Sequence, residues 1–134
     1  MTAETSAAVD AVVQGSFAVL DALTRSAAEH DLSLTQLRLL GILRDRTPSM
    51  AAIADHLGLD RSSVSGLIDR AERRGLVTRR TSADDARVTN IHLTPTGVDV
   101  AEQLAATVGG RVEALLARLS PAERRQLIEY LKLL

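Results

Sequence analysis

The chain has 134 residues, which suits one domain or one subunit of an oligomer. Hydrophobic residues make up 46% of it and aromatic residues only 1%, so the core must consist of Leu, Val, Ile and Ala, and little remains to stack on a planar cofactor. The absence of cysteine excludes a disulfide frame and a thiolate nucleophile. No apolar run approaches the roughly 20 residues of a membrane span, so we expect a cytoplasmic protein without membrane contact.

Charge is unevenly distributed along the chain, although the formal net charge is only −1. Residues 61–92 carry seven arginines against four acidic residues, a net charge of +3. Residues 1–33 carry one arginine against five acidic residues, a net charge of −4. A basic centre with an acidic arm fits local attraction to phosphate and disfavours a protein that is basic as a whole.

Two helices are predicted before the basic centre. Residues 5–29 contain no proline and carry small or apolar residues at steps of four and three. Ser33 and Gln36 fit a capping box that starts a second helix. Pro48 interrupts the chain after that helix.

The stretch from Met50 to Arg74 predicts a helix-turn-helix. Ala54 is small enough for two helices to cross, Gly58 can end the first helix at positive φ, and Asp60 can cap the second. A helix over residues 61–74 would bury a stripe of apolar side chains and expose a face of short hydroxyls, a glycine and charged groups. The buried stripe is Val64, Leu67, Ile68 and Ala71, and the exposed face is Ser62, Ser65, Gly66, Asp69, Arg70 and Arg73. Such a face fits a DNA major groove, whereas an isolated amphipathic helix would simply be solvated.

A β-hairpin is predicted next, with β-rich runs at residues 76–80 and 88–93 and a polar tip at residues 81–87. A hairpin behind a helix-turn-helix is a wing, and its arginines would lie at an adjacent minor groove. The alternative is a solvent-exposed hairpin with incidental charges.

Two further helices follow the hairpin. Thr94 and Pro95 start one whose apolar residues step by three and four from Val98 to Leu119, a heptad seam that Gly109 and Gly110 should weaken or bend. Ser120 and Pro121 start the last helix. Because one small head cannot cover these apolar helices, we expect a homodimer and leave an intrachain hairpin as the alternative. The predicted dimerisation residues are Val9, Val13, Val108, Val112, Leu115, Leu119, Leu127 and Leu131.

The ordered set of motifs resembles the MarR family of transcriptional regulators. The matching segments are residues 34–36, 53–59, 62–70 and 74–77, and the most specific are Asp85-Ala86-Arg87 and residues 91–97. The resemblance covers essentially the whole chain. It implies a mainly α fold with a small β-hairpin wing: one domain over residues 1–134, with a winged helix-turn-helix head at 34–93 on a helical dimerisation base formed by 1–33 and 94–134.

The resemblance also implies which residues meet DNA. In the family, the Asp and Arg of the wing motif hold the shape of the wing and place the Arg at the DNA. A basic residue often precedes that Arg, and its replacement by Ala86 removes one possible phosphate contact. The predicted DNA-binding residues are Arg61, Ser62, Ser63, Ser65, Gly66, Asp69, Arg70, Arg73, Arg79, Arg80, Asp85 and Arg87.

The function expected from these observations is sequence-specific binding of double-stranded DNA at a pseudo-palindromic operator by a homodimeric repressor. A small-molecule effector could release it. The alternative is a winged-helix module that binds protein and not DNA. We expect no enzymatic activity, cofactor or metal, because no nucleophile motif is present and His30, His56 and His92 are too scattered for a ligand set.

Overall fold

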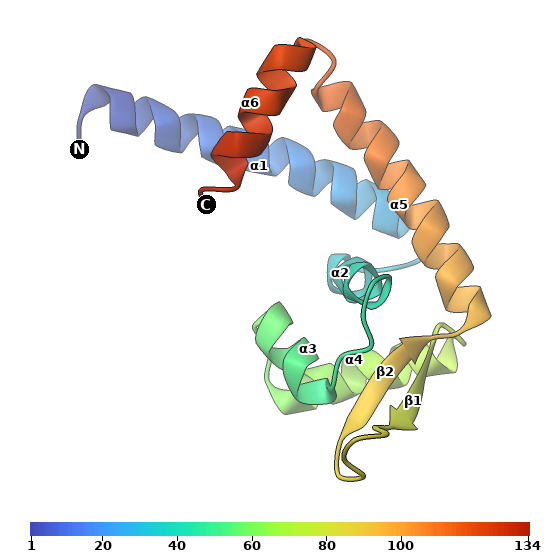
Figure 1. The fold of residues 1–134 in the computed structure, drawn as a ribbon. Helices are drawn as coiled ribbons and strands as arrows, with labels where there is room; N and C mark the ends of the chain where they lie inside the picture. The colour runs from blue at the N-terminus through green and yellow to red at the C-terminus, as the bar shows by residue number, and fades with distance from the viewer.

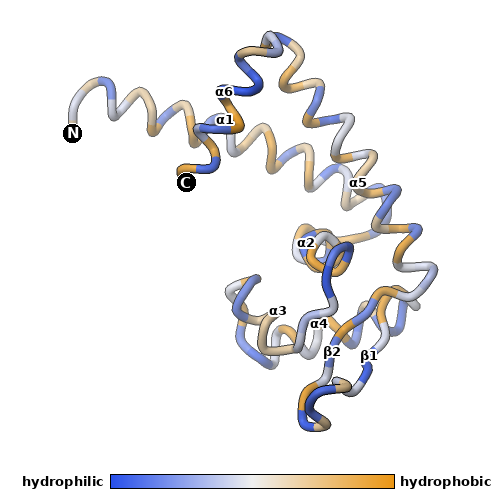
Figure 2. Tube along the Cα trace, viewed as in Figure 1, coloured by the Kyte–Doolittle hydropathy of each residue, from blue (hydrophilic) through white to orange (hydrophobic).

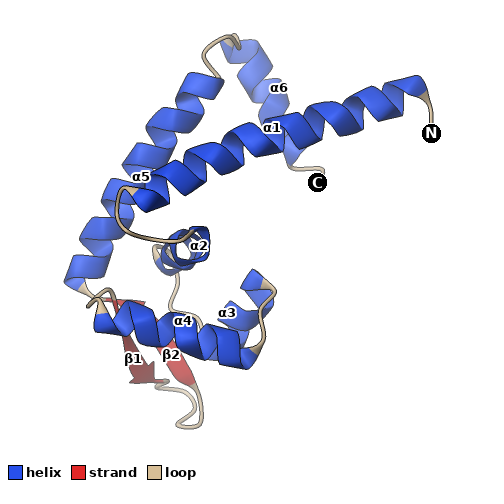
Figure 3. Ribbon diagram, turned by 180° about the vertical axis from the view of Figure 1, so that it is seen from behind, coloured by secondary structure: helices blue, strands red, loops and turns tan.

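The computed structural model describes all 134 residues and contains six helices and one two-stranded antiparallel hairpin (Figure 1). We call α2, α3, α4 and the hairpin the head, and α1, α5 and α6 the base. In both views α1 and α6 lie above the head, and α5 runs from the hairpin up to α6 (Figures 1 and 3). The mainly α fold with a β-hairpin wing is therefore confirmed. The elements are α1 (Ala3–Ala28), α2 (Leu34–Leu43), α3 (Met50–Leu57), α4 (Arg61–Arg73), β1 (Val77–Thr81), β2 (Thr89–Leu93), α5 (Pro95–Leu115) and α6 (Pro121–Leu131).

Short polar side chains cap the helices at the positions that the sequence indicates. Ser33 and Gln36 form the predicted capping box at the start of α2. The carboxylate of Asp60 accepts a hydrogen bond of 2.7 Å from the backbone N–H of Ser63 at the start of α4. That bond lowers the pKa of Asp60, so the cap is ionised at neutral pH. These local bonds set where the helices of the head begin.

The turn between α3 and α4 follows the predicted helix-turn-helix geometry. Gly58 adopts φ 66° and ψ 33°, and its N–H donates to the carbonyls of Ala54 and Asp55. Positive φ is the conformation in which a side chain is strained, so glycine suits this position. The predicted stripe of α4 is buried beneath the helix: Val64, Leu67, Ile68 and Ala71.

The wing is fixed to the head by backbone pairing. Its strands pair in a register that places Val77 opposite Leu93 and Thr81 opposite Thr89. The N–H of Ile91 also donates to the carbonyl of Pro48 at 2.9 Å, which joins β2 to the segment before α3. The middle of β2 is therefore attached to the head, while residues 82–88 form the tip of the hairpin.

One hydrophobic core fills the head, and α1 and α5 each contribute to it. The side chains of Leu39, Ile53, Ile68 and Ile91 are at most 1% exposed. Ala27 of α1 and Ala101 and Leu104 of α5 belong to the same cluster. One residue of the predicted heptad seam of α5, Ala101, is thus buried against the core of its own chain, whereas Val98 at the start of the seam is exposed.

The first turn of α5 is packed directly against the backbone that leads into the wing. The Oγ1 of Thr94 donates to the carbonyl of Gly75 at 2.5 Å, and its N–H donates to the carbonyl of Leu76 at 3.0 Å. A Cβ on Gly97 would lie 1.9 Å from that Leu76 oxygen. Only a glycine allows this approach. The expected bend at Gly109 and Gly110 does not interrupt α5, which stays helical to Leu115.

Hydrophobic residues recur along α1 and α5 of the base (Figure 2), and many large apolar side chains of the base are exposed. The first 21 residues of the chain are exposed, and the N-terminal half of α1 projects away from the head (Figure 1). By length and composition α1 could cross a membrane: its most apolar stretch of 18 residues has a mean hydropathy of 1.3. The expectation that no apolar run approaches a membrane span was therefore wrong for this helix. The same apolar surface could equally pack against another protein.

Candidate nucleic-acid interface

The exposed face of α4 presents the small and basic side chains that the sequence places there. Ser62, Ser65, Arg70 and Arg73 are exposed, and Gly66 is half-buried. Arg61, Arg70, Arg73 and Arg80 form no ion pair within the chain. Their charges are therefore free to attract an anionic partner.

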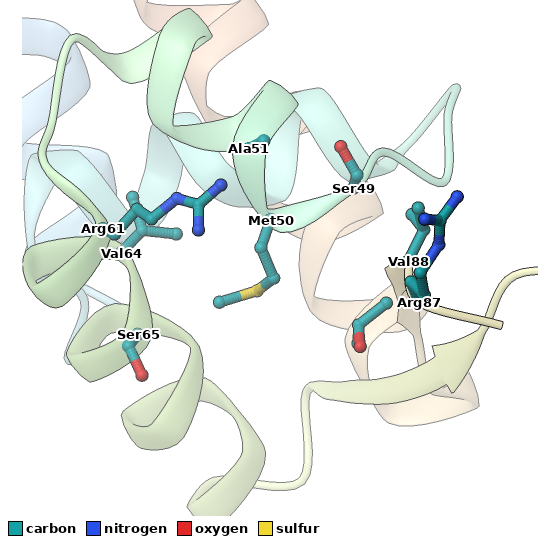
Figure 4. A pocket seen from close by; sticks show the side chains of 9 residues that line it. Ser49, Met50, Ala51, Arg61, Val64, Ser65, Arg87 and Val88 are labelled. Carbon is teal, nitrogen blue, oxygen red and sulfur yellow. The ribbon is translucent and has the colours of Figure 1, made fainter. Parts of the chain in front are cut away.

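A groove of about 400 Å³ separates α4 from the wing, and we call it the wing groove. Its lining includes Ser49 and Met50 from the start of α3, Arg61 and Ser65 from α4, and Arg87 from the wing. Figure 4 shows Arg61 and Arg87 on opposite sides with the side chain of Met50 between them. The groove thus combines two guanidinium groups, three hydroxyls and four apolar side chains, and its charged and hydroxyl groups suit a sugar and phosphate chain.

A second groove of about 390 Å³ lies along α4 and is lined by residues at the start of α2; we call it the α2 groove. Ser33 and Thr35 line it from α2, and Ser62, Ser63 and Arg70 line it from α4. Two grooves therefore border α4, each with hydroxyls and at least one arginine.

The wing motif makes the pairing that the resemblance implies. The carboxylate of Asp85 accepts from the backbone N–H of Arg87 at 3.0 Å and from its guanidinium Nε at 3.1 Å. These bonds lower the pKa of Asp85, which is therefore ionised at neutral pH. The side chain of Arg87 remains 90% exposed, so most of its guanidinium faces solvent.

Arg79 and Asp69, two of the predicted DNA-binding residues, are paired with each other. The Nη2 of Arg79 on β1 lies 2.5 Å from the Oδ1 of Asp69, and its Nη1 lies 3.5 Å from the Oε1 of Glu72. Both acidic residues belong to α4. The sequence showed the charges but not that Arg79 joins the wing to α4.

Some other lining residues were not predicted from the sequence. Ser49 and Met50 line the wing groove, and Ser33 and Thr35 line the α2 groove. Ser33 caps α2 and Ser49 caps α3, and both helices start beside α4. Their role as N-caps was the sequence signal that could have placed them at the site. Met50 carries no such signal, because a methionine at a helix start more often packs.

The predicted dimerisation residues all lie on the base but differ in exposure. Val9, Val13 and Leu131 are exposed, and so is Leu115 near the end of α5. A half-buried group completes the set, consisting of Val108, Val112, Leu119 and Leu127. Val108 and Val112 border a groove that faces α2 of their own chain.

No group of three or more histidine or acidic residues is placed to hold a metal ion.

Comparison with known sequences identifies relatives along most of the chain. A sequence model of the MarR family matches residues 30–88. A Thauera aromatica protein named as a regulatory protein for the hcr operon is 38% identical over 84 residues, which cover 63% of this chain and 51% of that protein. The HTH-type transcriptional regulator YkoM of Bacillus subtilis is 31% identical over 109 residues, 81% of this chain and 71% of YkoM. The match thus spans about half of the first relative and more of the second.

A solved structure shares the whole fold. A mutant of the transcription regulator MepR from Staphylococcus aureus, bound to an oligodeoxyribonucleotide, is 24% identical, with a TM-score of 0.67 over 92% of each chain. At that identity the likeness concerns the fold. The family match at residues 30–88 and the identity with YkoM, together with this shared fold, show that the chain belongs to the MarR family of transcriptional regulators.

Proposed function

We propose that this chain binds double-stranded DNA as a homodimer and represses transcription from a pseudo-palindromic operator. The observation that carries the proposal is the exposed face of α4, with one arginine-bearing groove on the wing side and another near α2. A helix in a major groove about 12 Å wide has a phosphate backbone on each side. The two grooves suit those backbones, and Ser62, Ser65 and Arg70 would meet base edges.

The wing adds a second attachment. Arg87 is held by Asp85 yet mostly exposed, and arginine is attracted by the negative potential of a narrow minor groove. Arg80 and Arg61 would contact phosphate. The DNA-bound MepR structure supports DNA as the partner, because MepR has the same fold and is bound to an oligodeoxyribonucleotide.

The homodimer is proposed to form through the base. Val9, Val13 and Phe17 of α1 and Ile128 and Leu131 of α6 are 42 to 58% exposed, which is unusual for apolar side chains of this size. Burial against a second copy would remove them from water, and it accounts for α1 without a membrane. The proposal therefore places the protein in the cytoplasm.

Sedimentation at micromolar concentration tests the dimer. Deletion of residues 1–20 should lower the mass to that of a monomer and preserve the circular dichroism of the head, because those residues are exposed in the isolated chain. A monomeric intact chain would refute the dimer.

A small-molecule effector is also proposed, because an apolar groove of about 390 Å³ lies between the head and the base. Leu37 and Leu40 of α2 line one side, and Leu104, Val108 and Val112 of α5 line the other. A ligand in this groove would contact both the head and the base, and it could favour one arrangement of the two heads of the dimer over another. Ligand screening by thermal shift tests this groove, and the matched control is Ala105→Gln, which fills the groove from a half-buried position outside the core.

The function is tested by selection of bound sequences from a random DNA duplex pool. A two-fold symmetric enriched site, with half-sites about one helical turn or roughly 10 to 10.5 base pairs apart, is the expected result. Arg87→Ala should weaken binding to all sequences and reduce the slope of log affinity against log salt by about 0.9 per lost phosphate contact. Arg125→Ala, an exposed change on α6, is the control and should alter neither quantity.

An unchanged affinity and slope in Arg87→Ala would show that the wing does not contact DNA. No enrichment of any duplex by the intact chain would instead favour the winged-helix protein-interaction module.

A further inference from the structure

The turn that follows α1 is held by α4, the proposed recognition helix, through one side chain. Arg74, the C-cap of α4, donates from Nη1 to the carbonyl of Asp31 at 2.7 Å and from Nη2 to the carbonyl of His30 at 2.9 Å. These carbonyls lie 43 and 44 residues away in sequence. Arg74 therefore joins the end of α4 to the turn that follows α1.

The same end of α1 is held from its other side by α5. The Nη1 of Arg111 donates to the Oγ of Ser26 at 2.8 Å, and its Nη2 pairs with the carboxylate of Glu29. Ser26 is fully buried, and its hydroxyl donates to the carbonyl of Ala22. The Arg111 pairing lowers the pKa of Glu29, so this contact is ionised at neutral pH.

The turn between these two arginines has little freedom of its own. Asp31 has φ 56° and is the only residue other than glycine with positive φ. The N–H of Leu32 donates to the carbonyl of Ala27, and both side chains belong to the core. A rotation of α4 about its C-terminal end would thus have to break the Arg74 bonds or move the end of α1.

We propose that Arg74 is a positioning residue that fixes the recognition helix relative to the base and so sets the half-site spacing that the dimer accepts. The inference rests on the proposed function, because spacing has meaning only for two heads on one operator. We assign Arg74 no base contact, because it caps the C-terminal end of α4 and its Nη1 and Nη2 atoms are directed at the carbonyls of Asp31 and His30. Its effect on binding passes through the orientation of α4.

A rigid link between α4 and α1 predicts how DNA affinity depends on the spacing of the half-sites. A rigid link makes a misplaced half-site costly, because both heads cannot seat at once without distortion of the protein or the DNA. A loosened link lets each head adjust, so the misspaced operator loses less affinity. The correctly spaced operator should then lose some affinity, because α4 must be ordered on binding.

The test compares two duplexes, the operator selected by the intact chain and the same operator with one base pair inserted between its half-sites. The measured quantity is the ratio of their dissociation constants. Arg74→Met removes the donors and keeps most of the aliphatic stem, and we expect the ratio to fall at least about threefold from its value in the unaltered protein. Arg74→Lys retains a charged donor without the forked geometry and should give an intermediate ratio.

The matched control is Arg25→Met, which also removes a guanidinium from a site near the end of α1. Arg25 pairs only with Asp21 on the same helix, so its loss leaves the link to α4 intact and the ratio unchanged. A variant that is merely less stable loses active protein for both duplexes equally, which also leaves the ratio unchanged.

An unchanged ratio in Arg74→Met, or an equal fall in Arg25→Met, would overturn the proposal. If Arg74→Met fails to fold by circular dichroism, the Arg74→Lys ratio decides, and a value equal to that of the unaltered protein refutes the link. Failure of the intact chain to bind any duplex would refute the proposed function itself, which is a distinguishable result.

Discussion

The head and the base of this molecule are built from similar amino acids and differ in what covers them. Leucine, isoleucine and valine of the head are packed into one core, where Ile53, Ile68 and Ile91 are fully buried. In the base, Phe17 and Ile128 are more than half exposed. Apolar content alone therefore does not identify a core. The head is complete within one chain, whereas the exposed residues of the base fit a surface that needs a partner.

The largest expected effect separates the two regions by substitution of similar side chains. Ile53→Ala should lower the free energy of unfolding by about 2 to 5 kcal/mol at any protein concentration, because it leaves a cavity in the core of the head. Leu131→Ala should change the unfolding of the isolated chain by less than about 0.5 kcal/mol, because Leu131 is 57% exposed. If the protein forms a dimer, the effect of Leu131→Ala on the free energy of unfolding should depend on protein concentration. Urea unfolding at two protein concentrations measures both changes, and an equal loss in the two variants would contradict the distinction.

The junction between the regions can be tested with two glycines of the same helix. Gly97→Ala places a Cβ 1.9 Å from the carbonyl oxygen of Leu76, and we expect a loss of about 1 to 3 kcal/mol. Gly110→Ala meets no atom within 4 Å and should gain about 0.5 to 1 kcal/mol, because alanine favours a helix. Thermal unfolding measures the two changes. A destabilised Gly110→Ala protein would indicate that a partner packs closely on that face of α5.

Local signals made most of the fold predictable from the sequence. The caps at Ser33, Asp60 and Thr94 involve residues at most three apart, and the turn at Gly58 needs only a glycine at the end of a helix. Periodicity correctly gave the buried stripe of α4. Hairpin boundaries shifted by about one residue, because strand ends depend on pairing across the hairpin.

The site was less predictable, because its geometry depends on contacts between distant residues. The sequence places Arg79 and Arg80 side by side, but only the fold brings Arg79 to Asp69. Arg74 resembles any other arginine at a helix end, and its acceptors are backbone carbonyls that no side-chain pattern reveals. Ala101 continues the heptad spacing yet packs inside the head. Spacing gives the face of a helix but does not name its partner.

The next prediction distinguishes the two neighbouring arginines of β1. Arg80 has no ionic partner, so Arg80→Ala should reduce the slope of log affinity against log salt by about 0.9, as expected for one lost phosphate contact. Arg79 is engaged by Asp69 and Glu72, so Arg79→Ala should leave the slope unchanged and weaken binding modestly through displacement of the wing. Titrations at several salt concentrations measure the slope. Equal slope changes would show that Arg79 leaves its partners to contact phosphate.

The smallest expected effect is the pH dependence of the wing. Its source is the ion pair of Asp85 with Arg87, which lowers the pKa of Asp85 below the ordinary value of 3.8. Because the folded state favours the ionised carboxylate, the pair stabilises the fold fully above the ordinary pKa and loses that contribution as pH falls through the lowered one. The difference in melting temperature between the unaltered protein and Asp85→Asn should be constant from about pH 8 to about pH 5 and shrink below about pH 4.

Asp84→Asn is the matched control for this measurement. Asp84 lies beside Asp85 at the wing tip, but its carboxylate forms no ion pair or hydrogen bond. The difference in melting temperature between the unaltered protein and Asp84→Asn should therefore not follow the titration of a paired carboxylate, as the Asp85→Asn difference does. If the two variants showed the same pH dependence, the effect would come from the total charge of the tip. Asp85 would then not hold Arg87 in place, and the exposure of Arg87 to DNA would have to be set by the backbone of the wing alone.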